Sequence, residues 1–529
     1  MKIDSLKPPH RIFDKSRPKA ALIALGMLGM TTILAGCSPK SETDAPSHNA
    51  EPSSQASVKP ADTNTADNAA KVVVRDFNFG TLSAGGVEIP QQGLLILPDD
   101  TKQHPVIIIS HLRAPNCDDN EFAYPCPKGA QPRRFDHGMQ YLGEALAKAG
   151  YAVIIPDLSV IYSGVATGEL SGQQALWRQA MTQIMDKLQA DNDTAKRMDF
   201  GQIGLFVHSR SAEMVNTAAE LFGERLRGVF GYGPSAETND FDHISPPPAD
   251  VPYLAVLGKL DADVNQAATQ WLGHWLDKPR QNAISVVSIP GFGHNYINRT
   301  LSSIGFDDRV GCDMLACADV DAHEKLVTDA ALSWFDATLK SAPTTLPQAA
   351  SDALPDTIFG IDAEWLSATP MAIATVNYDD FVADGDTLSL CRHANLMTRE
   401  QVKAACDEPE LGVISTITHI AKLTHAHANI QVAKASGMAI HLSPWGSRDT
   451  KVNDGVITIT LSTQSGKTAT INTPPQAHAL RDQADELSNG LYQLGTIRLN
   501  LPDDLAGETI SKIAIDSRLP IEVRSVDFY

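Results

Sequence analysis

The chain has 529 residues, a formal net charge of −20 and a hydrophobic content of 43%. This length exceeds that of one ordinary domain, so we expect two domains. The acidic balance argues against nucleic acid and anionic lipid surfaces as partners, because both would repel a negatively charged protein.

Residues 1–36 have the layout of a secretory signal. Six basic side chains precede residue 20, and an apolar run then extends to the "LAGC" segment that ends at Cys37. This ending resembles the lipobox of bacterial lipoproteins. The resemblance implies cleavage before Cys37, a lipid anchor on that cysteine and, because Ser38 follows it, sorting to the outer membrane, facing the periplasm or the cell surface. An uncleaved anchor helix is the alternative, but the apolar run is short for a membrane span.

Residues 37–70 predict a flexible tether. They are rich in Ser, Pro, Ala, Asp and Asn and contain few large apolar side chains. Such a segment cannot bury enough apolar surface to offset the entropy lost on ordering. We therefore expect the folded body to begin near residue 71.

Short apolar runs alternate with segments of helical periodicity from residue 71 to residue 342. Uniformly apolar, β-branched runs are typical of strands covered on both faces. The predicted strands are 105–110, 151–157, 202–209, 228–232, 251–258 and 283–290, and the predicted helices are 135–150, 172–188, 211–222 and 322–340. This alternation predicts an α/β domain with a mostly parallel sheet and right-handed crossovers.

Three residues that can carry chemistry follow predicted strands: Ser209, Asp261 and His294. The carboxyl ends of parallel strands meet at one edge of a sheet, where functional residues collect. A hydroxyl can attack a carbonyl, an imidazole can take its proton, and a carboxylate can orient the imidazole. The chain order Ser, Asp, His is that of α/β-hydrolase triads. We therefore expect a catalytic triad, with Asp263 as the alternative acid.

The segments "GYAVIIPD", "IGLFVHSRSAE" and "GFGHNYIN" resemble those of α/β-hydrolases of the dienelactone-hydrolase and polyester-hydrolase kind. The resemblance covers residues 71–342 and implies the α/β-hydrolase fold. It implies a serine hydrolase that cleaves carboxylic esters through an acyl-enzyme, without a metal or an organic cofactor. It also implies an oxyanion hole formed by the backbone N–H of Arg210 and that of Leu112 or Arg113.

Two positions depart from the G-x-S-x-G pattern of the nucleophile elbow: Val207 and Ser211 replace its glycines. Ser211 is small, whereas Val207 is β-branched and needs more room. One alternative is a strand-to-helix turn in which Ser209 only caps the helix. The chain would then be a non-catalytic binding lipoprotein on a hydrolase scaffold.

The cysteines point to an oxidising compartment. Apart from Cys37, six cysteines form three local pairs, which are Cys117 with Cys126, Cys312 with Cys317, and Cys391 with Cys406. An exported protein can oxidise such pairs, so we expect three disulfides between nearest neighbours. Zinc binding is the alternative, but no C-x-x-C spacing is present.

The pattern changes after a Pro- and Ala-rich linker at residues 343–358. Short alternating runs separated by Gly, Asn and Asp predict an antiparallel β-sandwich over residues 359–529. The last runs loosely resemble jelly-roll carbohydrate-binding modules, so a surface glycan-binding protein led by this domain is a third interpretation. His425 and His427 lie on one face of a predicted strand, and we expect them to be solvated rather than bound to a metal.

Overall fold

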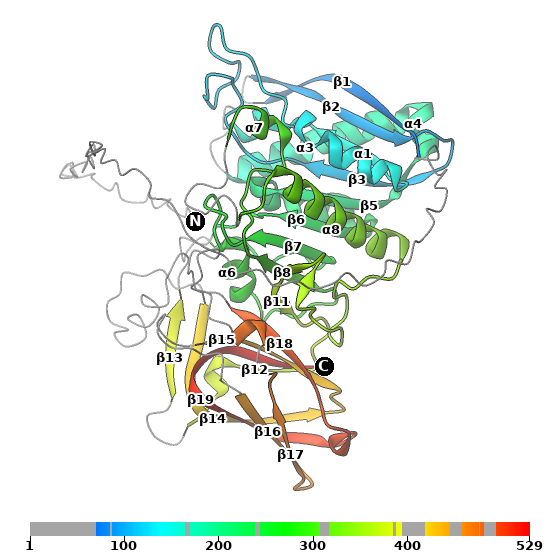
Figure 1. Ribbon diagram of the computed structural model, residues 1–529. Coiled ribbons are helices and arrows are strands. Elements are labelled where there is room, and N and C mark those ends of the chain that lie inside the picture. Colours follow the sequence, from blue (N-terminus) through cyan, green and yellow to red (C-terminus); the bar gives the residue numbers. More distant parts are fainter. Residues whose placement is uncertain are drawn as a thin grey trace, which may run out of the picture. The chain divides into compact units, whose positions relative to one another are not determined.

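The computed structural model describes residues 70–84, 87–163, 170–237, 244–306, 317–383, 388–393, 418–444, 457–474, 477–480 and 494–529. The predicted signal and, apart from Ala70, the predicted tether lie outside these residues. The described residues form two main sheets, an α/β part and a C-terminal β part (Figure 1). No helix among them is both long and apolar enough to cross a membrane.

The first sheet has nine strands in the order β1-β2-β4-β3-β5-β6-β7-β8-β11. The strands from β3 to β8 are mutually parallel, whereas β1, β2 and β11 pair antiparallel with their neighbours. Their bounds are β1 Val72–Ala84, β2 Val87–Pro98, β3 His104–Ser110, β4 Ala152–Pro156, β5 Met198–His208, β6 Leu226–Tyr232, β7 Tyr253–Gly258, β8 Ile284–Ile289 and β11 Glu364–Ala368. This mostly parallel mixed sheet is that of the α/β-hydrolase fold, so the predicted fold class is confirmed.

Helices cover both faces of this sheet. Figure 1 shows α8 crossing one face over β5 and β6. The α-helices are α1 Gln140–Lys148, α2 Ser159–Tyr162, α3 Leu170–Ala190, α4 Asn192–Arg197, α5 Val215–Phe222, α6 Ala267–His274, α7 Arg299–Ser303 and α8 Val320–Lys340, and short 3-10 helices are η1 His137–Met139, η2 Ser209–Met214 and η3 Gly223–Arg225. Each face of the sheet is therefore shielded from water.

The alternation of side chains along β3 explains the uniformly apolar run. Val106 and Ile108 pack into the core cluster that contains the apolar side of α3 and α5. Ile107 and Ile109 point the other way, into the cluster that contains α1 and α8. All four side chains are fully buried. A strand between two helical layers needs apolar residues at every position.

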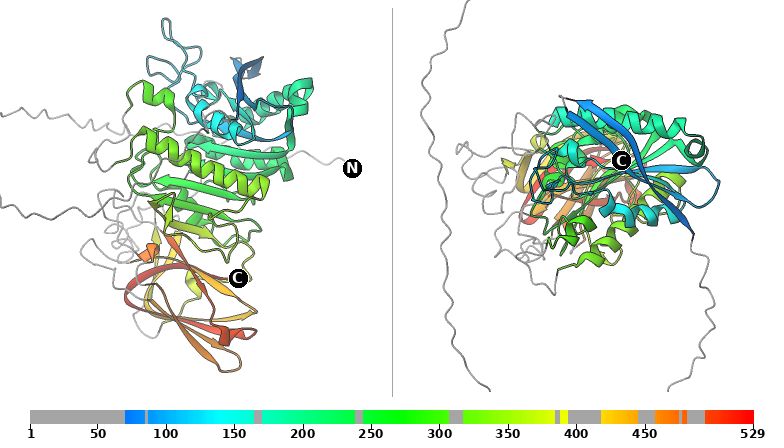
Figure 2. Two further views of the ribbon diagram at one scale, coloured as in Figure 1. Left: turned by 45° about the vertical axis from the view of Figure 1, so that its right-hand side comes forward. Right: turned by 90° about the horizontal axis from the view of Figure 1, so that it is seen from above.

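The C-terminal part is an antiparallel, sandwich-like β-domain, as the sequence predicts. It contains an eight-stranded sheet built around the long strand β19, which pairs with β12, β14, β15 and β16; Figure 2 shows β19 in red, strongly curved. Its elements are β12 Ala374–Asn377, η5 Tyr378–Asp380, β13 Leu388–His393, β14 Thr418–Ala433, β15 Gly437–Pro444, β16 Ile457–Thr463, β17 Thr468–Asn472, η8 His478–Leu480, β18 Gly495–Asn500, η9 Asp503–Leu505 and β19 Thr509–Phe528, and a separate two-stranded sheet pairs β9 Thr357–Ile358 with β10 Ile361–Asp362.

Strand β11 differs from the expectation. It lies within residues 359–529, yet it adds an antiparallel ninth strand to the first sheet beside β8. Glu364 on β11 forms a part-buried ion pair with Lys259, which directly follows β7. Further along the chain, the Thr496 hydroxyl accepts a hydrogen bond from the Ser367 N–H at 2.9 Å. The C-terminal segment therefore supplies both an edge strand and a charge partner to the α/β part.

Candidate active site

Ser209 lies at the sharp junction between β5 and η2. Its φ is 58°, in the left-handed region that non-glycine residues rarely adopt. A strained backbone at this point is the defining feature of a nucleophile elbow. A serine that only caps a helix has an extended backbone instead. The geometry at Ser209 therefore departs from the capping alternative.

Val207 fits into the core beside the elbow. It is fully buried, and its partner across the parallel ladder is Gly231 of β6. A Cβ atom at Gly231 would be in ordinary van der Waals contact with Val207 Cγ2, at 3.4 Å, but only 2.9 Å from the Tyr253 hydroxyl. Gly231 is therefore needed for the approach of Tyr253, and Val207 is packed in the core without closing the turn at Ser209.

Asp261 and His294 are in direct contact. His294 Nδ1 lies 2.6 Å from Asp261 Oδ2, and both side chains are buried. The other oxygen, Oδ1, accepts the backbone N–H groups of Asp263 at 3.0 Å and Val264 at 2.9 Å. Asp263, the alternative acid, is 58% exposed and lies 3.6 Å from the other imidazole nitrogen, Nε2. Of the two candidate acids, Asp261 is therefore the one that is buried and contacts the imidazole at Nδ1.

Three side chains hold the backbone of the His294 loop. His208, which precedes Ser209, donates from Nε2 to the His294 carbonyl at 2.9 Å, and the Tyr232 hydroxyl donates to the Gly293 carbonyl at 2.8 Å. The Gly293 N–H donates to Nε2 of His323 at 3.0 Å. Burial, with a smaller contribution from His294, lowers the pKa of His208 well below its ordinary value, so this imidazole is neutral.

Gly233 permits the close approach of the acid and the base. Its φ is 50°, and a Cβ atom there would lie 2.6 Å from His294 Nδ1 and 3.0 Å from Asp261 Oδ2. Gly233 is not among the residues predicted from the sequence, although it follows a predicted strand within "GYGPS", where a glycine can mark such an approach. His323 gave no comparable signal, because it lies within an ordinary helical pattern.

The residues predicted for the oxyanion hole flank this site. Arg210 is in the first turn of η2, where backbone N–H groups have no acceptor within the helix. Leu112 and Arg113 follow β3, the strand that pairs with β5. Within the described part of the chain, neither of their N–H groups donates to an acceptor. These three N–H groups can therefore receive a developing negative charge.

Glu213 is a buried acid on the helix that follows Ser209. Its side chain is 8% exposed, and the Ser245 hydroxyl donates to its Oε2 at 3.0 Å. Burial raises the pKa of Glu213 to about 7, and the Ser245 hydrogen bond and the charge of Arg210 oppose only part of this rise. The sequence offered no signal for this acid.

One disulfide closes the loop after β3. Cys117 and Cys126 are bonded, and Cys117 is fully buried. The Arg113 guanidinium stacks over the ring of Phe122, which lies between the two cysteines in sequence, at 4.3 Å from the ring centroid. Cys317 is also disulfide-bonded. The predicted partner of that residue, Cys312, lies outside the described residues, as do Cys406 and the side chain of Cys391.

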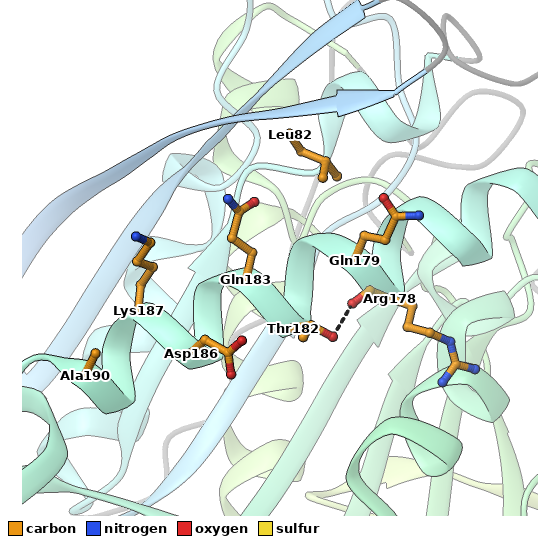
Figure 3. Close-up of a pocket in the computed structure, with 8 residues that line it drawn as sticks. All are labelled: Leu82, Arg178, Gln179, Thr182, Gln183, Asp186, Lys187 and Ala190. Carbon is orange, nitrogen blue, oxygen red and sulfur yellow. Dashed lines mark hydrogen bonds between the residues drawn. The ribbon is translucent and has the colours of Figure 1, made fainter.

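One groove and one histidine pair among the described residues contain none of the predicted catalytic residues. A groove of about 640 Å³ follows α3, with Leu82 of β1 facing Gln179 and Gln183 (Figure 3). In the C-terminal domain, His425 pairs with Asp516, and His427 pairs across the ladder with Ala514. The described residues contain no cluster of three or more His, Cys, Asp or Glu side chains suited to a metal ion.

The described residues thus form an α/β-hydrolase fold in which Ser209 lies at the strained turn after β5. Residues 135–339 match the model of the dienelactone hydrolase family. No curated protein matches the chain in sequence at a significant level. The matched range includes Ser209, Asp261 and His294, but not the loop after β3 or the C-terminal domain.

Solved structures of several hydrolases resemble part of the chain. A ferulic acid esterase from Streptomyces cinnamoneus has 12% identity and a TM-score of 0.38 over 53% of this chain and 94% of its own. An acylaminoacyl peptidase from Pyrococcus horikoshii has 12% identity and a TM-score of 0.34 over 52% of this chain and 43% of its own. Est1E from Butyrivibrio proteoclasticus has 14% identity and a TM-score of 0.29 over 49% of this chain and 99% of its own. At these TM-scores, the likeness carries no conclusion about activity.

Proposed function

We propose that the chain is a serine hydrolase that cleaves carboxylic esters. Ser209 is the nucleophile, His294 is the general base and Asp261 orients His294. The observation that carries this proposal is the buried 2.6 Å contact between Asp261 and His294, next to the strained turn at Ser209. The match of residues 135–339 to the dienelactone hydrolase family supports it, because that range contains all three residues.

The first half of the reaction acylates the enzyme. Ser209 Oγ bonds to the ester carbonyl carbon while His294 Nε2 takes the hydroxyl proton. Asp261 keeps the Nδ1–H in place and stabilises the imidazolium, and the backbone N–H groups of Arg210 and of Leu112 or Arg113 stabilise the oxyanion. The C–O bond to the alcohol then breaks, and His294 returns the proton to the departing alcohol.

The second half releases the acid. A water molecule gives a proton to His294 as its oxygen bonds to the acyl carbon. The bond to Ser209 breaks, Ser209 regains the proton, and the carboxylic acid leaves. This cycle uses only side chains and backbone groups of the chain.

We also propose that a lipid on Cys37 anchors the enzyme to the bacterial outer membrane, facing the periplasm or the cell surface. The support is the signal layout of residues 1–36 and the "LAGC" segment. The following tether, residues 37–70, would let the folded body move away from the bilayer.

The test compares three variants of the full chain, purified in detergent, on nitrophenyl esters of short and medium acids. We expect Ser209→Ala to lower kcat by at least about 10⁴-fold and Asp261→Asn to lower it by about 10⁴-fold. The matched control is Asp263→Asn, which we expect to keep kcat within about fivefold of the wild type, because Asp263 does not contact Nδ1.

Three results would contradict the proposal. A folded wild type that hydrolyses no ester would leave the non-catalytic scaffold as the better account. Equal losses in the Asp261 and Asp263 variants would remove the assignment of the acid. Glycan binding by the full chain, without ester hydrolysis, would favour the glycan-binding interpretation.

A further inference from the structure

Ser211, which replaces the second glycine of the elbow pattern, makes two buried hydrogen bonds. Its Oγ lies 2.5 Å from the His111 carbonyl oxygen and 2.8 Å from the Tyr162 hydroxyl. A carbonyl can only accept, so the single Ser211 proton goes to His111. The Tyr162 hydroxyl must then donate to Ser211. Ser211 therefore joins the helix after the nucleophile to the loop after β3.

The His111 side chain holds the next peptide of the same loop. Its Nε2 accepts the Leu158 N–H at 2.8 Å, so the ring proton is on Nδ1. Nδ1–H donates to the Leu112 carbonyl at 2.8 Å. The imidazole is fully buried, and the edge of the Tyr162 ring packs against it.

These contacts fix two consecutive peptide planes. In a planar trans peptide, the N–H points away from the C=O. The anchor on the His111 carbonyl therefore orients the Leu112 N–H, and the anchor on the Leu112 carbonyl orients the Arg113 N–H. As described above, the Leu112 and Arg113 N–H groups donate to no acceptor among the described residues.

Tyr162 strengthens the same connection from a third element. It is the last residue of α2 and is fully buried. Its hydroxyl donates to Ser211, and its carbonyl accepts the Arg113 Nε–H at 2.9 Å. Ser211 and Tyr162 thus connect three segments: α2, the helix η2 that contains Ser209, and the loop after β3.

We infer that Ser211 is a positioning residue for the oxyanion hole, acting through the His111–Leu112 peptide. This inference rests on the proposed serine-hydrolase function. A glycine at residue 211 would lack the hydroxyl that makes this anchor. Where the elbow pattern has a glycine, this chain thus has a serine whose hydroxyl fixes the position of the loop after β3 relative to Ser209.

The test uses the full chain with Ser211→Ala and Tyr162→Phe, and Ser285→Ala as the matched control. Ser285 is also buried, and its hydroxyl bonds only to Ser367 among the described residues. Each protein is assayed on a nitrophenyl ester and titrated with an alkyl trifluoromethyl ketone. This ketone bonds to the nucleophilic oxygen and leaves an oxyanion in the oxyanion hole, while His294 holds the displaced proton.

We expect Ser211→Ala to lower kcat about tenfold with KM changed less than about twofold, and to weaken ketone inhibition by the same factor as kcat. Tyr162→Phe should change both quantities in the same direction by a smaller factor, which keeps the test decisive if Ser211→Ala does not fold. Ser285→Ala should change neither quantity.

Unchanged kcat and ketone inhibition in folded Ser211→Ala and Tyr162→Phe, with an active wild type, would overturn this inference alone. A loss of thermal stability with normal ketone inhibition would do the same, because it would mark a merely structural contact. A folded wild type that neither hydrolyses the ester nor binds the ketone would overturn this inference and the proposed function together.

Discussion

Val207 shows that the turn at Ser209 forms without a glycine at this position of the pattern. The glycine pattern expresses a need for space between the strand, the turn and the helix. In this chain the Val207 side chain is fully buried in the core cluster that contains α3 and α5, and Ser209 keeps its left-handed backbone. A glycine is needed instead at Gly233, whose missing side chain admits His294 and Asp261.

Val207→Ala should therefore cost stability rather than activity. The fully buried side chain belongs to the core cluster that contains α3 and α5, so its truncation should lower the free energy of unfolding by about 2 kcal/mol. We expect kcat to stay within about threefold, because Ser209 keeps its turn. Urea unfolding and ester kinetics on the same preparation measure both quantities. A gain in kcat without a loss of stability would mean that Val207 obstructs the elbow.

Glu213 should make stability depend on pH. Its pKa is raised from 4.5 to about 7, so the folded state holds more protons than the unfolded state between these values. Stability contributed by Glu213 is therefore present below the unfolded pKa and lost as pH rises through the folded pKa. Over that window, the loss should be at most about 3 kcal/mol.

Glu213→Gln tests this directly, since it keeps a polar side chain that does not titrate. Urea unfolding at about pH 5 and about pH 8 should show a smaller fall in stability for the variant than for the wild type. The same fall in both proteins would assign the pH dependence to other groups.

Apolar patterns predicted the central strands of the first sheet well and the strands at its edges poorly. The six predicted strands of the α/β part correspond to β3 to β8, because strands between two helical layers are apolar at every position. The hairpin of β1 and β2 was overlooked, since polar residues such as Arg75 and Asp76 interrupt an edge strand that faces water. Strand β11 was overlooked because its partner, β8, lies about 80 residues away in sequence, and local patterns carry no information on such pairings.

The residues of the candidate site also fall into those that local sequence patterns predict and those that they do not. Ser209, Asp261 and His294 could be proposed from residue type and chain order, because each follows a strand that the pattern reveals. Glu213 and His323 could not, because their roles depend on which distant groups pack against them. The helix after Ser209 was predicted from residue 211, whereas a 3-10 turn from Ser209 precedes α5.

The disulfide loop should contribute more to stability and substrate binding than to catalysis. A double Cys117→Ser, Cys126→Ser variant frees a loop with a sequence separation of 9, which should lower the free energy of unfolding by about 2–3 kcal/mol. We expect KM to rise, because the loop that carries Phe122, the partner of Arg113, is no longer closed by the disulfide. We expect kcat to change less, because Ser211 and His111 hold the carbonyl groups on either side of the Leu112 N–H and the Arg113 N–H without the disulfide. Steady-state kinetics separate these effects. A loss confined to kcat would contradict this division.

The negative net charge of the chain bears on how the proposed membrane anchor would work. Loss of residues 1–36, with six basic and two acidic side chains, would take the net charge from −20 to about −24. Such a body would be repelled by anionic lipid, so a covalent anchor, not surface charge, would keep it at the membrane. A single acyl chain gives only marginal membrane binding, so stable attachment would need a second anchoring interaction.

Cys37→Ser should therefore prevent lipid attachment. In a bacterial expression host, the wild type should incorporate a clickable fatty acid and lose residues 1–36. The variant should incorporate none and, because the cleavage is expected before Cys37, should keep residues 1–36, which mass spectrometry detects. A wild type that keeps residues 1–36 and incorporates no fatty acid would favour the uncleaved anchor helix.

Covalent labelling of Ser209 tests its assignment as the nucleophile. The full chain is treated with a fluorophosphonate, digested and analysed by mass spectrometry, with Ser209→Ala as the control. We expect one phosphonylated peptide, modified at Ser209, absent from the control and suppressed when an ester substrate is added first. If a correctly folded wild type takes up no label, or if the Ser209→Ala control takes up as much label as the wild type, Ser209 is not the nucleophile.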